Sequence, residues 1–532
     1  MKKLQWMLAA GLICGSIMFT GCSDSSSTPS VPDESVVSQK LVGKWMLSER
    51  NGEKVLTNQK MVITVESQTR GYVSASFDGS FVTPLKKDKD DDDYSYSLNL
   101  WKALAKHGVS ITGNTLIVTE YGSETDVVQK YTISSITDDE MVATMHLTFV
   151  GDDESNKARE NRPDPVVRFV KVKDDFSKDI VALWEGKSTS EKDEYDDGKL
   201  HRWKFSDDEN YLYFEKDGDS WVVGDDYYNE YFVDGNLLCF RWFDLDSEKR
   251  EWWEIESIKD GVMKWTALRK DKDGKEYTAS FELKQPKMPA QKDVEKYMIG
   301  KWVPVDADGY EYLTDYKTVT TFESTKKGYR SASIFNSDDV PDLWSERDPL
   351  NIKVKDNKIS FSEKDSEYGY SIQIDYSIVS ISDKEMTAFY TESYTDDDDG
   401  DVFFVYEEYV RMVKVTDMSK DVIGLWEGKI TSDKSEYDDG QDHRWEYKDD
   451  GTYVYYSKVD GEWEPVSNKL NEYFVDGNLL CTRWVDEDGN EYREWWDISS
   501  IKDGVMKWTA YRMDDNYDYY TASFKMKKVT SK

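Results

Sequence analysis

The chain is poor in the residues that usually carry catalysis. Its 532 residues include 4 histidines and 4 cysteines, and no nucleophile elbow, H-E-x-x-H, P-loop or cysteine–histidine signature occurs among them. The many carboxylates lie in loops, without the defined separation that a glycosidase pair needs. We therefore expect no enzymatic activity, no cofactor and no dedicated metal centre.

Positive charge is also scarce. Lysine and arginine total 69 against 106 aspartates and glutamates, so the formal net charge is −37. A surface this acidic excludes nucleic acid as a partner. The acidic runs at residues 90–93 and 396–399 could gather calcium, but they lack the glycine and carbonyl spacing of a calcium loop. Solvated loops are the simpler interpretation.

The four cysteines do not suggest a disulfide framework. Cys14 belongs to an N-terminal leader and Cys22 follows that leader directly. Cys239 and Cys481 occupy equivalent places in two related segments, each inside an apolar run. Equivalent positions of separate domains seldom lie within bonding distance, so we predict two buried free thiols.

Residues 1–21 have the organisation of a signal peptide. Two lysines precede an apolar stretch at residues 6–19, which is too short to span about 30 Å of hydrocarbon. The segment ends in small residues before Cys22 and resembles a bacterial lipobox. That resemblance implies cleavage before Cys22, lipidation of its sulfur and amino group, and anchoring of the protein to a membrane. An ordinary signal peptide with an incidental cysteine is the alternative.

The residue after the proposed lipid site is Ser23 rather than an acidic residue. By resemblance to the sorting rules of lipoproteins, this implies the outer membrane rather than the inner one. Whether the protein faces the periplasm or the cell surface stays open. We expect residues 22–39 to form a flexible tether.

The rest of the chain consists of four related units. A short apolar lead-in followed by a tryptophan opens each of them, at Trp45, Trp184, Trp302 and Trp426. This pattern suits a first strand that places a large ring at the bottom of a closed sheet. The tryptophan is thus predicted to plug each barrel.

Units two and four are close copies of each other. Residues 229–239 read the same as residues 471–481, and residues 257–267 the same as 500–510. Units one and three match less closely, for example at residues 71–76 and 328–333. We therefore predict an A-B-A′-B′ order, with domains at residues 40–175, 176–287, 288–416 and 417–532.

A second motif recurs in all four units. It reads aromatic-x-Ile-x-x-Ile-x-Asp and begins at Tyr131, Trp253, Tyr376 and Trp496. Its aromatic ring and first isoleucine share one face of a strand, and the aspartate starts a hairpin turn. In unit four, strand-like runs separated by turns occur at residues 422–430, 443–447, 452–457, 471–475, 478–485, 491–498, 505–512 and 519–526.

Eight short strands in such a unit are typical of an up-and-down barrel. We expect Met506, Trp508 and Ala510 to face inward. The fold class is therefore all-β, as four tandem small antiparallel meander barrels. The first-strand tryptophan and the late-strand arginines, Arg168 and Arg411, resemble lipocalins. The repeated hairpin is similar to the lipocalin-like domains of Bacteroidetes lipoproteins.

Aromatic residues and two recurring histidines are the leads to a ligand site. The chain has 19 tryptophans and 35 tyrosines, more than small cores require. Trp253 and Trp496 are predicted to be core residues, so Trp252 and Trp495 must point outward, where packing against the adjoining domain is our first interpretation. The candidate ligand-binding residues are His201, Trp203, Trp242, Trp252, His443, Trp445, Trp484 and Trp495.

The sequence leaves two functions open. The first is a lipid-anchored envelope protein that binds a glycan or a small apolar molecule in barrel mouths or on aromatic patches. The alternative is a structural or adaptor lipoprotein whose filled barrels contact another envelope protein. The two differ in whether the barrels leave a cavity.

Overall fold

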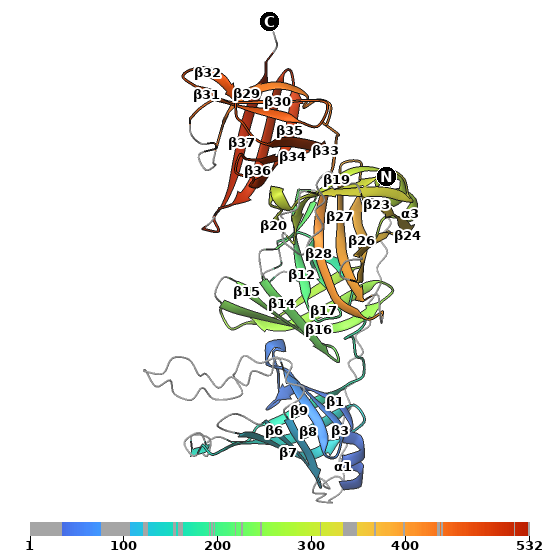
Figure 1. Cartoon of the computed structure of the whole chain (residues 1–532). Helices are drawn as coiled ribbons and strands as arrows, with labels where there is room; N and C mark the ends of the chain where they lie inside the picture. The colour runs from blue at the N-terminus through green and yellow to red at the C-terminus, as the bar shows by residue number, and fades with distance from the viewer. Residues whose placement is uncertain are drawn as a thin grey trace, which may run out of the picture.

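The structure is a computed structural model of the chain, and Figure 1 shows four β-barrels that follow one another along it. It describes residues 34–529, except 76–106, 121–125, 153–155, 158–162, 191, 193–194, 196, 219, 225–226, 245–246, 309, 333–347, 366–368, 397–399, 433–436, 438–439 and 515. The predicted all-β fold of four antiparallel meander barrels in A-B-A′-B′ order is confirmed.

The first unit is a sheet of nine described strands ordered β4-β3-β1-β9-β8-β7-β6-β5, with β2 paired to β1. A hydrogen bond of 3.0 Å from Ile111 N to Gln68 O links its two ends. Its elements are α1 (Glu34–Leu41), β1 (Gly43–Arg50), β2 (Glu53–Lys54), η1 (Thr57–Gln59), β3 (Met61–Ser67), β4 (Arg70–Ala75), β5 (His107–Thr112), β6 (Thr115–Glu120), β7 (Asp126–Ile136), β8 (Glu140–Val150) and β9 (Val166–Val172).

The second unit has the strand order β13-β12-β11-β10-β18-β17-β16-β15-β14. A hydrogen bond of 2.8 Å from Tyr231 N, in the last strand of this order, to Glu209 O, in the turn before β12, connects the two ends of the sheet. Its strands are β10 (Leu183–Ser188), β11 (His201–Phe205), β12 (Tyr211–Asp217), β13 (Ser220–Val223), β14 (Tyr227–Asp234), β15 (Leu237–Asp244), β16 (Ser247–Lys259), β17 (Val262–Lys270) and β18 (Glu276–Lys284).

The third unit repeats the topology of the first, in the order β23-β22-β21-β19-β28-β27-β26-β25-β24, with β20 paired to β19. Its elements are α3 (Gln291–Tyr297), β19 (Gly300–Ala307), β20 (Tyr310–Glu311), η2 (Thr314–Tyr316), β21 (Thr318–Phe322), β22 (Lys327–Ala332), β23 (Asp348–Asn351), β24 (Lys353–Lys355), β25 (Lys358–Asp365), β26 (Tyr370–Ile381), β27 (Glu385–Asp396) and β28 (Val402–Val415).

The fourth unit repeats the second, in the order β32-β31-β30-β29-β37-β36-β35-β34-β33. Its strands are β29 (Gly424–Ile430), β30 (His443–Tyr447), β31 (Tyr453–Val459), β32 (Glu462–Pro465), β33 (Leu470–Asp476), β34 (Leu479–Val485), β35 (Glu491–Lys502), β36 (Val505–Met513) and β37 (Tyr519–Lys528). The prediction missed β32, because its four residues include a proline and too few apolar side chains to show a period of two.

The first-strand tryptophan plugs each barrel as predicted. Trp45, Trp184, Trp302 and Trp426 expose at most 1% of their surface. Each indole nitrogen donates a hydrogen bond of 2.6 to 2.7 Å to the carbonyl four residues earlier. The buried indole is thus satisfied by the chain that enters the barrel.

The inward and outward faces of the strands also follow the prediction. Met506, Trp508 and Ala510 are buried in the core of the fourth barrel. One difference lies at the start of the described chain. Residues 34–39, which the sequence placed in a tether, belong to α1, and Val37 of this helix is fully buried in the first core. Among the described residues, no helix is both long and apolar enough to cross a bilayer.

The first and second units dock through the same contact as the third and fourth. Buried apolar residues from both partners form a cluster at each junction. The clusters are Met46, Val62, Phe232, Leu237 and Cys239 at the first junction and Val303, Val319, Leu479, Cys481 and Trp495 at the second. Cys239 and Cys481 are buried free thiols, as predicted, and the adjoining barrel is what covers them.

A hairpin turn packs tightly against the preceding unit at each junction. Gly235 and Gly477 both have positive φ, +64° and +59°. A Cβ on either glycine would lie 2.4 or 2.5 Å from a valine of the preceding unit, Val172 or Val415. Only glycine tolerates both the backbone conformation and this contact.

An ion pair accompanies each turn. The carboxylate of Asp476, 1% exposed, accepts hydrogen bonds from the Lys301 ammonium and the Ser331 hydroxyl of the third unit. Asp234 makes the same contacts with Lys44 and Ser74. Each A-type and B-type pair is therefore joined by both apolar packing and a buried ion pair.

Candidate functional site

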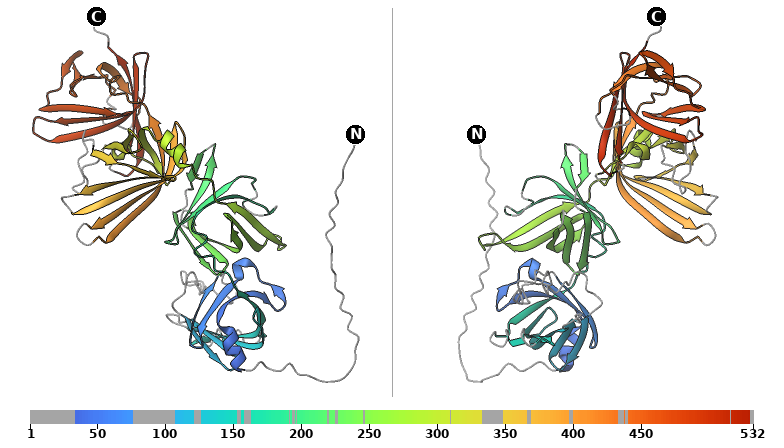
Figure 2. Two further views of the ribbon diagram at one scale, coloured as in Figure 1. Left: turned by 90° about the vertical axis from the view of Figure 1, so that its right-hand side faces the viewer. Right: turned by 60° about the vertical axis from the view of Figure 1, so that its left-hand side comes forward.

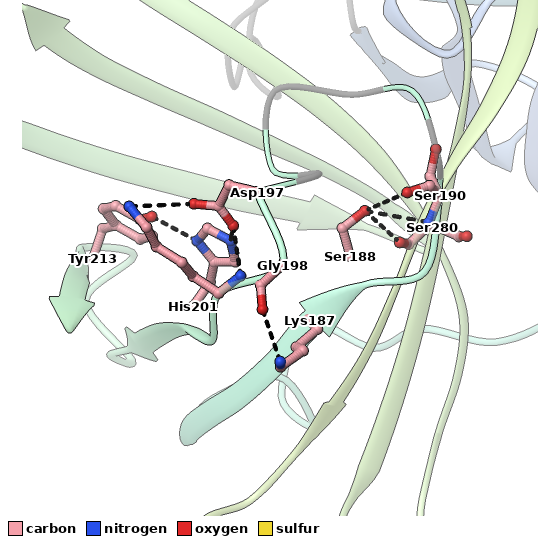
Figure 3. A network of polar contacts seen from close by, with 9 residues as sticks. Lys187, Ser188, Ser190, Asp197, Gly198, His201, Tyr213 and Ser280 are labelled. Atoms are coloured by element: carbon pink, nitrogen blue, oxygen red, sulfur yellow. Dashed lines mark hydrogen bonds and ion pairs between the residues drawn. The ribbon is translucent and has the colours of Figure 1, made fainter. Parts of the chain in front are cut away.

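Two of the predicted aromatic pairs lie inside barrels. His201 and Trp203 expose 5% and 4% of their surface, and His443 and Trp445 expose 3% and 5%. In Figure 3, His201 lies between Tyr213 and Asp197, whose oxygens are 2.8 and 3.2 Å from its two ring nitrogens. Because both nitrogens have partners, this histidine is already satisfied by the protein.

His443 repeats this arrangement in the fourth barrel. Its Nδ1 lies 2.8 Å from the Tyr455 hydroxyl and its Nε2 lies 3.2 Å from the Tyr437 carbonyl. The ring of Tyr437 packs edge-on against both His443 and Trp445, at 5.2 and 5.8 Å between centroids. The two predicted residues therefore support Tyr437 from inside the barrel.

Trp252 and Trp495 point away from their own cores, as predicted, and face the junctions between units. Trp252 is half-buried in the first junction, and Trp495, 8% exposed, belongs to the second. In the described structure, neither indole nitrogen has a hydrogen-bond partner. Packing against the adjoining domain thus accounts for their burial but leaves a donor unused.

Trp484 and Trp242 lie at equivalent places near the mouths of the fourth and second barrels. Both are half-buried. Trp484 stacks on Tyr492, with centroids 5.4 Å apart and planes 15° apart, and Tyr492 is 43% exposed. The two rings form an aromatic platform that is open to solvent at one end.

This platform borders a pocket of about 420 Å³ at the mouth of the fourth barrel. Its walls come from the fourth unit and, on one side, from η2 of the third. The lining residues are Asp315, Tyr437, Trp484, Tyr492, Arg493, Glu494, Trp495 and Arg512. The structure thus brings Trp484 and Trp495 to one site, with His443 and Trp445 behind it and the second-unit candidates elsewhere.

Glu494 organises the polar side of the pocket. Its carboxylate accepts hydrogen bonds of 2.9 Å from the Tyr437 hydroxyl and from Arg512. The Arg512 guanidinium also lies 4.5 Å from the centre of the Trp496 ring. These contacts hold a carboxylate and a guanidinium in fixed orientations beside the aromatic platform.

Asp315 reaches the pocket from the third unit because η2 docks on the fourth barrel. The Thr314 hydroxyl accepts a hydrogen bond of 2.9 Å from Tyr511 N, and Lys317 pairs with Asp497 at 2.7 Å. Burial raises the pKa of Asp315, although the positive charge of Arg512 opposes this. Its Oδ1 is buried without a hydrogen-bond partner among the described residues.

The second barrel has the same mouth with two changes. The Tyr195 hydroxyl and Arg269 contact Glu251 there as their counterparts contact Glu494. However, Lys249 pairs opposite Trp242 where Tyr492 pairs opposite Trp484. Asn58 of η1 takes the place of Asp315. At these two positions the second mouth therefore carries a lysine and an amide, where the fourth mouth carries a stacked ring and a second carboxylate.

The sequence prediction named two of the eight lining residues of this pocket, Trp484 and Trp495, and missed the other six. Tyr437 lies in a segment repeated in units two and four, Glu-Tyr-Asp-Asp-Gly, and that repetition was the available signal. Asp315 could not be found in this way, because it arrives from another unit through docking. The described residues include no cluster of three or more potential metal ligands. The acidic run at 90–93 and residues 397–399 of the second run lie outside the described residues.

No protein family matches the chain, and no curated protein resembles it significantly. Solved structures of Transferrin Binding Protein B are similar to it. Two mutants from Haemophilus parasuis Hp5 share 9% identity over 97% of this chain and 99% of theirs, with a TM-score of 0.16. The isotype 1 protein from serogroup B Neisseria meningitidis shares 8% identity over 92% of this chain and 99% of its own, also with a TM-score of 0.16.

Proposed function

We propose that this protein is a lipid-anchored envelope protein without catalytic activity, and that it binds a glycan at the mouth of its fourth barrel. The observation that carries the proposal is the pocket itself. It places the stacked rings of Trp484 and Tyr492 beside two carboxylates, Asp315 and Glu494, and the guanidinium of Arg512.

Such a lining matches the chemistry of a sugar. One face of a sugar ring carries C–H groups that pack on an aromatic ring, while its hydroxyls both donate and accept hydrogen bonds. Asp315 Oδ1 and Trp495 Nε1 supply an unused acceptor and an unused donor at the same pocket.

The pocket fits a small apolar molecule less well. Four of its eight lining residues are charged, and an apolar ligand would leave these groups without water or other partners. We therefore favour the glycan over the apolar molecule that the sequence also allowed.

The adaptor function is supported by a different surface. Leu183 and Phe214 of the second unit pack on Phe389 and Tyr409 of the third. The equivalent face of the fourth unit carries Trp463, half-buried under the Arg444 guanidinium at 4.2 Å. Strands β31 and β32 of this face, labelled in Figure 1, belong to the unit that lies at the opposite end of the molecule from the first unit (Figure 1 and Figure 2), where another envelope protein could dock.

The remaining parts of the proposal come from the sequence. They are the signal peptide at residues 1–21, the lipid anchor at Cys22 in the outer membrane, the four domain boundaries and the resemblance to Bacteroidetes lipoproteins. Labelling of the whole protein with a radioactive fatty acid, with and without Cys22→Ala, tests the anchor.

The glycan site is tested by titrating soluble residues 23–532 with a panel of oligosaccharides and recording tryptophan fluorescence and melting temperature. We expect Trp484→Ala to weaken binding at least tenfold, because it removes the platform. Trp242→Ala, the matched change in the second mouth, should leave affinity unchanged. If no oligosaccharide binds, or if both variants lose binding equally, the proposed site is wrong.

A further inference from the structure

The third barrel contains a second cavity, of about 210 Å³, which opens to solvent beside Tyr316 and Tyr406. It lies inside the barrel, and side chains from β19, β21, β22 and β26 to β28 line it. Most of its lining side chains are polar, which is unusual for the interior of a small barrel.

In the first barrel, the positions equivalent to this lining carry apolar core residues. Thr320 pairs with Arg330 across β21 and β22, in the register in which Ile63 pairs with Val73 across β3 and β4. Ile63 and Val73 are buried members of the first hydrophobic core. A guanidinium has thus replaced a core valine.

Two more core positions have changed on the hairpin that follows. Tyr390 and Glu392 of β27 take the places of Met145 and Leu147 of β8, because the hairpins β26–β27 and β7–β8 share one register. Met145 and Leu147 are 4% and 5% exposed in the first core. The third barrel places a phenol and a carboxylate there.

Glu408 supplies the first of two carboxylates in the cavity. It is 7% exposed and accepts hydrogen bonds from the hydroxyls of Tyr312, at 2.6 Å, and Tyr406, at 2.5 Å. Burial and the neighbouring charge of Glu408 raise the pKa of Tyr312, so this phenol stays protonated and keeps donating.

Glu392 holds the second carboxylate in the same manner. It accepts hydrogen bonds from the hydroxyls of Tyr390 and of Tyr394, the latter at 3.0 Å. A carboxylate has about four acceptor positions. Each of the two therefore keeps acceptor capacity after its tyrosines have bound.

The charges in and around the cavity do not balance. Arg330 is paired with Glu363 at 3.3 Å, and this pair compensates the guanidinium. Glu392 and Glu408 then remain as negative charge among the rings of Tyr312, Tyr376 and Tyr390. Burying charged groups costs free energy that apolar side chains of similar size avoid, and the first barrel shows that the fold does not need them.

We propose that the third barrel binds a small organic ammonium ion. Two carboxylates supply its counter-charge, and the faces of the tyrosine rings attract a cation electrostatically. The cavity volume corresponds to about seven waters at about 30 Å³ each, which fits a compact amine or quaternary ammonium group. This site is separate from the mouth of the fourth barrel and does not depend on the proposed glycan binding.

The test uses soluble residues 23–532, with choline as the probe and its uncharged isostere dimethylbutanol as the matched control. Binding is measured by calorimetry, and stabilisation is measured as a change in melting temperature. We expect choline to bind saturably and raise the melting temperature, and dimethylbutanol to bind at least tenfold more weakly. Glu392→Leu, which restores the first-barrel residue, and Glu408→Gln should each weaken choline binding at least tenfold. Both variants should still melt cooperatively.

Two control variants distinguish this site from the pocket at the mouth of the fourth barrel. Trp484→Ala and the exposed Glu323→Gln should not change choline binding. The proposal is overturned if choline does not bind at millimolar concentration, if the isostere binds equally well, or if Glu392→Leu folds and binds choline as the unaltered protein does.

Discussion

Replacing Asp476 by asparagine should loosen the contact between the third and fourth units. The substitution removes one negative charge but keeps the shape of the side chain and a residue that suits the following turn. Lys301 and Ser331 would lose the carboxylate that both now contact. The perturbation therefore acts on docking rather than on the fold of either barrel.

The size of the effect follows from burial. The side chains of Asp476 and Lys301 are 1% and 14% exposed, and breaking a buried pair by removing one partner costs about 3 to 5 kcal/mol. Lys301 keeps Asp417 at 3.6 Å and the Tyr329 hydroxyl at 2.5 Å, which places the cost near the lower end. We expect docking to weaken by about 3 kcal/mol, or roughly a hundredfold in the population of the open state.

The chain carries its own reporters for this opening. Cys481 and Cys239 are fully buried, one at each junction, so a neutral maleimide reaches each thiol only when its junction opens. In soluble residues 23–532 these are the two cysteines present. Labelling followed by mass spectrometry measures both rates in one sample.

We expect Asp476→Asn to accelerate labelling of Cys481 roughly a hundredfold and to leave Cys239 unchanged. The matched variant Asp234→Asn should do the reverse. The reasoning is refuted if Cys481 accelerates less than threefold, or if both cysteines accelerate together, because general unfolding rather than undocking would then expose them.

Two further substitutions test single residues. Burial raises the pKa of Asp308 to about 6, so its contribution to stability falls as pH rises from about 4 to about 6. In urea unfolding, Asp308→Asn should therefore stabilise the third barrel by about 2 to 3 kcal/mol at pH 7 and little at pH 4. Asp488→Asn, in an exposed hairpin, is the control. An equal gain in stability at both pH values would contradict the raised pKa of Asp308. Trp426→Phe leaves the Val422 carbonyl without its donor and should cost about 2 kcal/mol in the same assay; a loss below about 0.5 kcal/mol would mean that the indole bond does not hold the plug.

The repeats made much of the fold predictable. Trp45, Trp184, Trp302 and Trp426 recur before alternating strands, and local turn chemistry together with a period of two decides which side chains face inward. The same alternation indicated that Trp495 points away from its own core. These features depend on short-range geometry that any one unit contains.

The candidate sites could be predicted less well from the sequence, because their residues come together only through docking and barrel closure. Asp315 reaches the pocket beside Trp484 from a different unit. The change from Val73 to Arg330 is visible when residues 71–76 are aligned with 328–333. Its meaning appears only when Glu392 and Glu408 are seen around the same cavity.

The amino-acid pattern was enough to establish the strand order of the barrels, their A-B-A′-B′ succession and the buried thiols, since each follows from periodicity and repetition along the chain. Tertiary structure decided that side chains of the third barrel surround a cavity, and which outward ring is covered by a neighbour. Those outcomes depend on side chains far apart in sequence, such as Tyr312 and Glu408, whose hydroxyl and carboxylate meet only after the sheet has closed around them.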